Sequence, residues 1–117
     1  MTHRILVVDD DPDVLALVTM VLSLDGYQVI EAKSPREAQA LLDEAAPDLV
    51  ITDLNFGTET SLDFTRRGVA DGRRILVMTA AVSAVDVPED LEDHVRILRK
   101  PFSLEELRTA VTRGLEP

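Results

Sequence analysis

Polar side chains that could bind a metal ion and a phosphate group follow four short apolar runs of this chain. Asp9 and Asp10 follow the first run, and Asp53 follows another. Thr79 and Lys100 end two further runs in the C-terminal half. In an open α/β sheet, ligands bind beyond the carboxyl ends of the strands, where the strand order reverses. If the four runs are strands of one such sheet, all five side chains meet at one edge.

The three carboxylates of this set would repel one another unless a cation joined them. At a separation of about 5 Å and an effective dielectric constant near 20, each pair costs roughly 3 kcal/mol. Such a set of oxygen ligands suits Mg²⁺, which binds one or two carboxylates together with a phosphate. Lys100, the Thr79 hydroxyl and the backbone N–H groups of Leu54 and Ala80 could then hold phosphoryl oxygens. The carboxylate of Asp53 could act as a nucleophile and form an acyl phosphate.

The apolar runs alternate with longer amphipathic segments, a pattern typical of βαβ units and a parallel sheet. Right-handed crossovers leave few topologies, and the strand order 2-1-3-4-5 places the first and third strands side by side. We therefore expect an α/β fold in three layers (α/β/α), with a doubly wound, five-stranded parallel sheet. The runs predict strands near residues 5–8, 28–32, 48–52, 75–78 and 95–99.

Signals for helix ends mark several of the connecting segments. Pro12 can occupy the first turn of a helix that Gly26 ends. The pattern Ser-x-x-Glu at residues 34–37 and 103–106 predicts two capping boxes, and the helix that follows the first should end before Pro47. Two apolar stripes are expected to face the core: Val14, Leu17, Val18, Val21 and Leu24 in the first helix, and Leu104, Leu107, Val111 and Leu115 in the last. Met20 and Met78 are also expected to pack in the core.

Length and charge limit the classes of function. The 117 residues fit a single domain over residues 1–117, and the chain has no cysteine for a disulfide or a thiolate metal site. A formal net charge of −10 opposes direct contact with nucleic acid. The longest mainly apolar stretch, residues 14–24, is too short to cross a membrane. The chain begins without a signal peptide, so we expect a cytoplasmic location.

The chain resembles the receiver domains of bacterial two-component response regulators over essentially its whole length. Any one matching pair of residues is weak evidence, but their order and spacing together are highly specific. The resemblance implies a flavodoxin-like fold. The matching segments are Ile5-Leu6-Val7-Val8-Asp9-Asp10, Leu49-Val50-Ile51-Thr52-Asp53-Leu54, Thr79-Ala80 and Lys100-Pro101-Phe102.

The resemblance implies a magnesium site and a site of phosphorylation. Asp53 would accept phosphate from the phosphohistidine of a sensor histidine kinase or a phosphotransfer protein. Asp10 would bind Mg²⁺ directly, and Asp9 would bind it through water or position Lys100. The backbone carbonyl of Asn55 would be a further metal ligand. Such a receiver catalyses only its own phosphotransfer and dephosphorylation, and it has no small-molecule substrate as an enzyme would.

The resemblance also implies a conformational switch. Thr79 would move toward the phosphoryl group, and the small side chain of Ala80 would leave room for it. Lys100 would pair with phosphoryl oxygens, and its bond to Pro101 would be cis. The output would pass to a downstream protein or to an output domain, and the sequence identifies neither of them. It also leaves open the kinase, the pathway and the oligomeric state, a homodimer included.

Three features depart from the pattern of the family. Ile97 stands three residues before the lysine, where an aromatic switch residue is usual. The usual Met-Pro and Asp-Gly are missing after Asp53, so the segment 56–61 and the third helix should be short. Pro88 and four acidic residues interrupt the fourth helix, and we expect residues 81–93 to be mobile or rearranged.

Two alternatives come from other functional classes. A phosphatase of the haloacid-dehalogenase type also uses an aspartate nucleophile, and residues 9–11 contain its Asp-x-Asp spacing. The next residue, however, is Pro12, and the chain has no room for that fold's cap. The second alternative is a phosphorylation-independent interaction module on a receiver fold, which Ile97 favours and the complete acidic site opposes.

Overall fold

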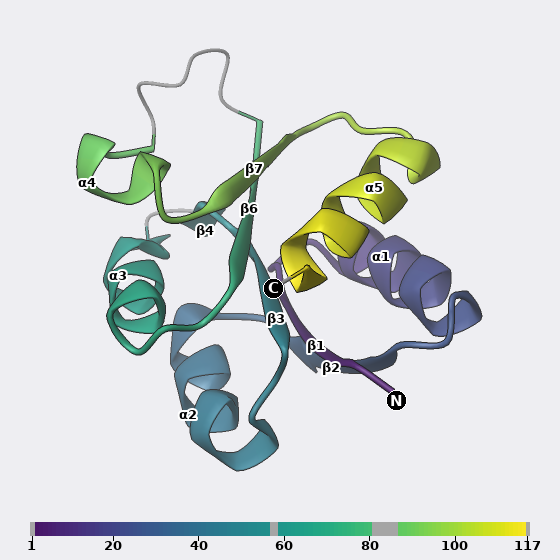
Figure 1. Cartoon of the computed structure of the whole chain (residues 1–117), viewed down its shortest axis with the longest axis horizontal. Coiled ribbons are helices and arrows are strands. Elements are labelled where there is room, and N and C mark those ends of the chain that lie inside the picture. Colours follow the sequence, from purple (N-terminus) through teal and green to yellow (C-terminus); the bar gives the residue numbers. More distant parts are fainter. Residues whose placement is uncertain (1, 57–58, 81–86, 117) are drawn as a thin grey trace.

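A five-stranded parallel sheet with helices on both faces forms the protein (Figure 1). The computed structural model describes residues 2–56, 59–80 and 87–116. The sheet order is β2-β1-β3-β6-β7, which confirms the predicted order of five strands. The strands are β1 (Arg4–Val8), β2 (Gln28–Ala32), β3 (Leu49–Asp53), β6 (Ile75–Thr79) and β7 (Arg96–Arg99); the helices are α1 (Pro12–Leu24), α2 (Pro35–Ala45), α3 (Leu62–Ala70), α4 (Glu89–Glu92) and α5 (Leu104–Leu115).

The pairing register aligns the carboxyl ends of the four strands that carry the candidate site. Val8 of β1 lies beside Thr52 of β3, so the residues that follow each of them leave the sheet at the same level. On the other side of β3, Asp53 lies beside Met78, one residue before Thr79. Thr79 in turn pairs with Arg99, which directly precedes Lys100.

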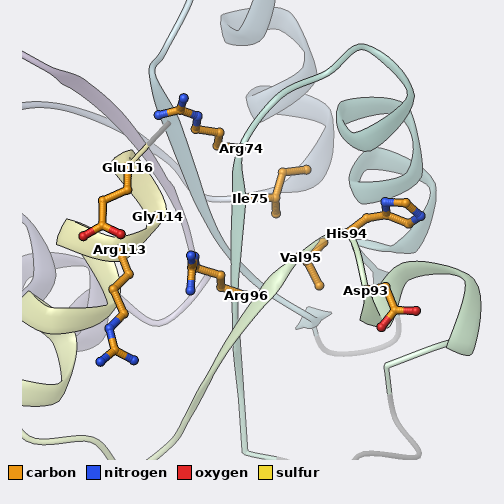
Figure 2. Close-up of a pocket in the computed structure, with 9 residues that line it drawn as sticks. All are labelled: Arg74, Ile75, Asp93, His94, Val95, Arg96, Arg113, Gly114 and Glu116. Carbon is orange, nitrogen blue, oxygen red and sulfur yellow. The ribbon is translucent and has the colours of Figure 1, made fainter.

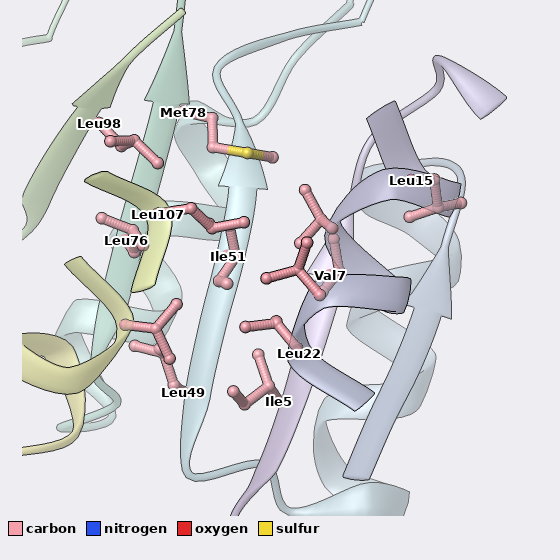
Figure 3. Close-up of a cluster of buried hydrophobic side chains, with 13 residues drawn as sticks. Ile5, Val7, Leu15, Leu22, Leu49, Ile51, Leu76, Met78, Leu98 and Leu107 are labelled. Atoms are coloured by element: carbon pink, nitrogen blue, oxygen red, sulfur yellow. The ribbon is translucent and has the colours of Figure 1, made fainter. Parts of the chain in front are cut away.

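Apolar side chains alternate between two cores, one on each face of the sheet. Ile5 and Val7 of β1 face α1 and α5, whereas Leu6 and Val8 face α2, α3 and α4. Figure 3 shows the first core, in which Leu107 of α5 packs with strand residues and α1. The central strands are buried on both faces, which explains why they are continuous apolar runs in the sequence.

Helix α1 buries a face that only partly overlaps the predicted one, and Val14 packs against the first core as expected. Val18 and Val21 are buried as expected, but the exposed fractions are 40% for Leu17, 53% for Met20 and 75% for Leu24. The buried face contains Leu15 and Leu22 instead. Apolar residues surround almost the whole circumference of this helix, so their spacing could not decide which stripe faces the sheet.

Helix ends mostly follow the predicted signals. Asp11 accepts a hydrogen bond from the N–H of Asp13, which caps α1. Ser103 and Glu106 form the complete capping box of α5, whereas Ser34 shows only its bond from the N–H of Glu37 among the described contacts. One prediction for α5 was wrong: Leu104 is exposed although it shares a helix face with Leu107 and Val111, because it lies in the first turn, at the end of the buried stripe.

The region after β3 is reduced, as the sequence indicated. Helix α3 has 9 residues. A two-stranded antiparallel pair, β4 (Asn55–Phe56) and β5 (Glu59–Thr60), precedes it and was not predicted. Runs of two residues are too short to show a strand pattern, so the sequence gives no signal for this pair.

Helix α4 is a single turn of 4 residues. Val87 and Leu91 bury their side chains in the second core. Asp90 accepts a bidentate ion pair from Arg66 of α3, with nitrogen–oxygen distances of 3.0 and 3.3 Å. The expected rearrangement is therefore confirmed for residues 87–93, where the helix is much shortened, while residues 81–86 lie outside the described part of the chain.

We expect truncation of Leu107 to destabilise the fold strongly, because its side chain is fully buried in the first core. Leu107→Ala should lower the free energy of unfolding by about 2–5 kcal/mol, as measured by urea denaturation. The control Leu104→Ala removes the same atoms from an exposed position of the same helix and should cost less than about 0.5 kcal/mol. Equal losses in the two variants would contradict the packing described above.

Candidate phosphoryl and metal site

Three carboxylates converge at the carboxyl edge of the sheet. Asp9, Asp10 and Asp53 each place an oxygen within 4.8 Å of the oxygens of the other two. Asp9 is fully buried, Asp10 is exposed and Asp53 is partly buried, so the cluster opens to solvent on one side. The backbone N–H of Asp11 donates to Oδ1 of Asp9 at 2.9 Å and fixes that carboxylate. Such a donor set fits a hard divalent cation that keeps part of its water.

Lys100 joins two of these carboxylates. Its Nζ donates to Oδ2 of Asp9 at 3.0 Å and to Oδ2 of Asp53 at 3.1 Å. The backbone N–H of Lys100 donates to the carbonyl of Thr79 at 2.8 Å, which anchors the lysine at the end of β7. The Lys100–Pro101 bond is cis, as the resemblance implied. A cation supplied by β7 is therefore held among carboxylates supplied by β1 and β3.

Burial and neighbouring charges shift the pKa values of Asp9 and Lys100 in opposite directions. Burial raises the pKa of Asp9, and the N–H of Asp11 and Lys100 only partly oppose that effect. Burial also lowers the pKa of Lys100, but its hydrogen bonds and attraction to Asp9 and Asp53 outweigh burial and leave the pKa raised. Lys100 therefore keeps its positive charge at neutral pH. One lysine still leaves the three carboxylates undercompensated, and this excess negative charge favours a further cation.

The remaining predicted residues lie at the same edge. Thr79 ends β6 with 2% of its surface exposed, and Ala80 follows it at the surface. The N–H of Leu54 donates to the carbonyl of Met78 at 3.2 Å, so in this conformation it already has an acceptor. The backbone of Asn55 continues directly from Leu54 into β4. The roles predicted for these four residues stay predictions.

Two buried polar residues support Asp53 and were not predicted. The hydroxyl of Thr52 donates to the carbonyl of Asp53 at 2.9 Å, and Thr52 is fully buried. The N–H of Ser61, also fully buried, donates to the carbonyl of Leu54 at 3.0 Å and closes the loop after the strand. The role of Thr52 could have been recognised only from its being a threonine within an apolar strand. The role of Ser61 depends on the geometry of the loop after β3, which residue spacing does not show.

The comparison with protein families agrees with this geometry. Residues 5–112 match the model of the response regulator receiver domain. The chain belongs to this family. It is a receiver domain of the two-component type, in which phosphorylation and magnesium binding are typical, and this membership decides against the haloacid-dehalogenase alternative.

Named relatives of the receiver domain differ in length. The chain is 38% identical to the alginate biosynthesis transcriptional regulatory protein AlgB of Pseudomonas aeruginosa, covering 97% of this chain and 26% of that protein. It is 28% identical to sporulation initiation phosphotransferase F of Bacillus subtilis, covering 98% of this chain and 95% of that protein. The receiver therefore spans about a quarter of one relative and nearly the whole of the other.

A solved structure confirms the fold. The chemotaxis response regulator CheY4 of Vibrio cholerae superimposes with a TM-score of 0.88 at 28% identity, covering 98% of this chain and 100% of that one. As for membranes, none of the helices in the described ranges is long and apolar enough to span a bilayer.

We expect Asp10→Asn to stabilise the receiver in metal-free buffer, because it removes one of three mutually repelling charges. The free energy of unfolding should rise by about 1 kcal/mol, less than the full Coulomb estimate because Asp10 is exposed. The same variant should lose most of the increase in Tm that Mg²⁺ gives the unmodified chain. Urea denaturation without Mg²⁺ measures the first effect, and differential scanning fluorimetry with and without Mg²⁺ measures the second.

The matched control is Asp13→Asn, which removes an exposed carboxylate from the first turn of α1, three residues after Asp10. It should leave the response to Mg²⁺ unchanged. A similar loss of that response in both variants would mean that general surface charge, and not the cluster, binds the ion.

Proposed function

We propose that Asp53 is the phospho-acceptor of this receiver and that Asp9, Asp10 and Asp53, with the backbone carbonyl of Asn55, hold Mg²⁺. The observation that carries the proposal is the double hydrogen bond of Lys100 Nζ to Asp9 and Asp53 beside the carboxylate cluster. When bound, the ion would neutralise negative charge on the carboxylates and on the phosphoryl oxygens.

In the proposed transfer, an oxygen of Asp53 attacks the phosphorus of a phosphohistidine on a partner protein. The new oxygen–phosphorus bond forms while the phosphorus–nitrogen bond breaks, and the imidazole leaves with the electron pair and takes up a proton from solvent. Lys100 donates to phosphoryl oxygens, which develop charge during the transfer. The N–H of Ala80 and the hydroxyl of Thr79 would bind the other oxygens. Hydrolysis by water would return Asp53 to its free carboxylate.

The engaged N–H of Leu54 refines this proposal. It would have to be shared between the carbonyl of Met78 and a phosphoryl oxygen, or released from the carbonyl, before it could serve as a donor. Movement of β6 relative to β3 would do this, and Thr79 lies at the end of the same strand. Phosphorylation would then shift a two-state equilibrium, because the phosphoryl group interacts with Thr79 and Leu54 differently in each state.

Exposed apolar side chains on the two helices that follow Asp9 and Lys100 in the chain support a protein as the phosphate donor. Leu17 and Met20 lie on α1, which begins three residues after Asp9, and Leu104 lies in the first turn of α5, four residues after Lys100. Apolar surface of this kind is typical of protein contacts. We infer that the donor is a sensor histidine kinase or a phosphotransfer protein. Output would pass to a protein target or to an attached domain. Residues 1–117 would act as one domain in both steps.

Ile97 favours a second candidate function, a receiver fold that binds partners without phosphorylation. Its side chain is partly buried against the second core and carries no ring that could turn inward. The one-turn helix α4 also favours this second candidate, because it leaves little helical surface that could respond to phosphorylation. The intact Lys100 bridge supports the phosphorylated receiver more strongly.

Labelling with acetyl phosphate in the presence of Mg²⁺ tests the proposed function. The chain should gain one phosphoryl group, detected by intact-mass spectrometry, and Asp53→Asn should abolish the gain. Lys100→Gln should slow labelling by about 100-fold, because a charged donor to the transferring group is lost. Asp43→Asn, at an exposed position of α2, is the control and should label normally.

An unmodified chain that takes up no phosphate would favour the phosphorylation-independent module. Equal labelling of Asp53→Asn and the unmodified chain would instead place the acceptor elsewhere.

A further inference from the structure

Figure 2 shows the residues that line a groove of about 350 Å³. The groove lies at the amino ends of the strands, whereas Asp53 lies at their carboxyl ends. It is bounded by the amino ends of β6 and β7 and by the C-terminal end of α5. Arg74 contributes from the sheet before β6, Arg96 from the start of β7, and Arg113 from α5. Three arginines in one groove are notable in a chain whose net charge is −10.

The strand register brings two of these arginines together. Arg96 pairs with Leu76 in β6, and Arg74 precedes Leu76 by two residues. The N–H of Val50 donates to the carbonyl of Arg74, so sheet pairing extends to this residue. Residues two apart on a strand share a face, so Arg74 and Arg96 lie diagonally on the α5 side. Figure 2 shows both side chains extending toward the end of α5, while Arg113 extends away from them.

Neither guanidinium of this pair is neutralised in the described part of the chain. Arg74 donates through Nη1 to the carbonyl of Leu115, which is an uncharged acceptor. Arg96 has no hydrogen bond or ion pair from its side chain to any described residue. By contrast, three other cations form ion pairs with carboxylates at 3.1 Å or less: Arg66 with Asp90, Lys100 with Asp9 and Asp53, and Arg108 with Asp25.

A purely structural explanation accounts for only part of this arrangement. The C-terminal end of a helix carries about half a negative charge, and Arg74 satisfies a carbonyl there. Two full positive charges exceed that half charge. Asp93 and Glu116 also line the groove, but neither forms an ion pair with Arg74 or Arg96 within the described ranges. With Arg113 included, three positively charged side chains line the groove against two carboxylates, in a chain whose net charge is −10.

We propose that this groove binds a compact dianion, either a phosphate group or a dicarboxylate. Guanidinium groups bind both in the same way, through pairs of parallel N–H donors to oxygen. The bond from Arg74 to Leu115 holds one donor in place before the ligand arrives, which lowers the entropic cost of binding. The site is separate from Asp53 and does not depend on its phosphorylation.

An NMR titration of the Asp53→Asn chain in Mg²⁺-free buffer tests this site. Inorganic phosphate and malonate are added in separate experiments, at an ionic strength held constant with NaCl. We expect saturable changes at the amides of Val95, Arg96 and Glu116, with a dissociation constant on the order of 1 mM. A response to both anions supports a general dianion site, and a response to one alone identifies which of the two chemistries the groove prefers.

Charge-removing variants make the test specific. Arg96→Gln and Arg74→Gln should each weaken binding at least about tenfold, since each removes a charged donor. Arg67→Gln removes an exposed arginine of α3 outside the groove and should leave the affinity unchanged. Unshifted amide spectra away from the groove verify that each variant is folded. Non-saturable changes, changes centred on Lys100, or equal affinity in Arg96→Gln would overturn the proposal.

Discussion

The contact of Lys100 with Asp9 and Asp53 is the interaction around which the site is organised. Lys100 is 91 positions from Asp9 and 47 positions from Asp53 in the chain. The contact exists only because β1, β3 and β7 end at the same level of the sheet. Asp9 has lost all contact with solvent, so its carboxylate needs both the N–H of Asp11 and the lysine. The same lysine holds Asp53 in place. Strand order, burial and charge are therefore coupled at a single nitrogen atom.

Most of the fold and of the site could be predicted because strand ends carry strong signals. Each central strand is a continuous apolar run that stops at a polar residue, and the parallel sheet aligns those stops. The order 2-1-3-4-5 is one of the few that crossover handedness allows. Asp9, Asp10, Asp53 and Lys100 lie together for these reasons, and no information beyond residue type and spacing was needed to expect it.

The features that escaped prediction depend on packing and not on pattern. Helix α1 is apolar around most of its circumference, so only its position against the sheet selects Leu15 and Leu22 over Leu17 and Leu24. The pair β4 and β5 has two residues in each strand, which no periodicity can show. The engaged N–H of Leu54 likewise follows from how far β6 reaches beside β3, a distance set by the fold as a whole.

Helix α4 is attached to the protein by two different kinds of contact, and they respond differently to solution conditions. Val87 and Leu91 are buried, and their contribution is almost insensitive to electrolyte. The pair of Arg66 with Asp90 is exposed, so dissolved ions screen it with a Debye length of about 8 Å at physiological ionic strength. Lys100 and its carboxylates are far less accessible to counterions. A concentrated buffer would therefore weaken the attachment of this turn while leaving the ion pairs of Lys100 with Asp9 and Asp53 intact, which makes ionic strength a means of separating the two regions experimentally.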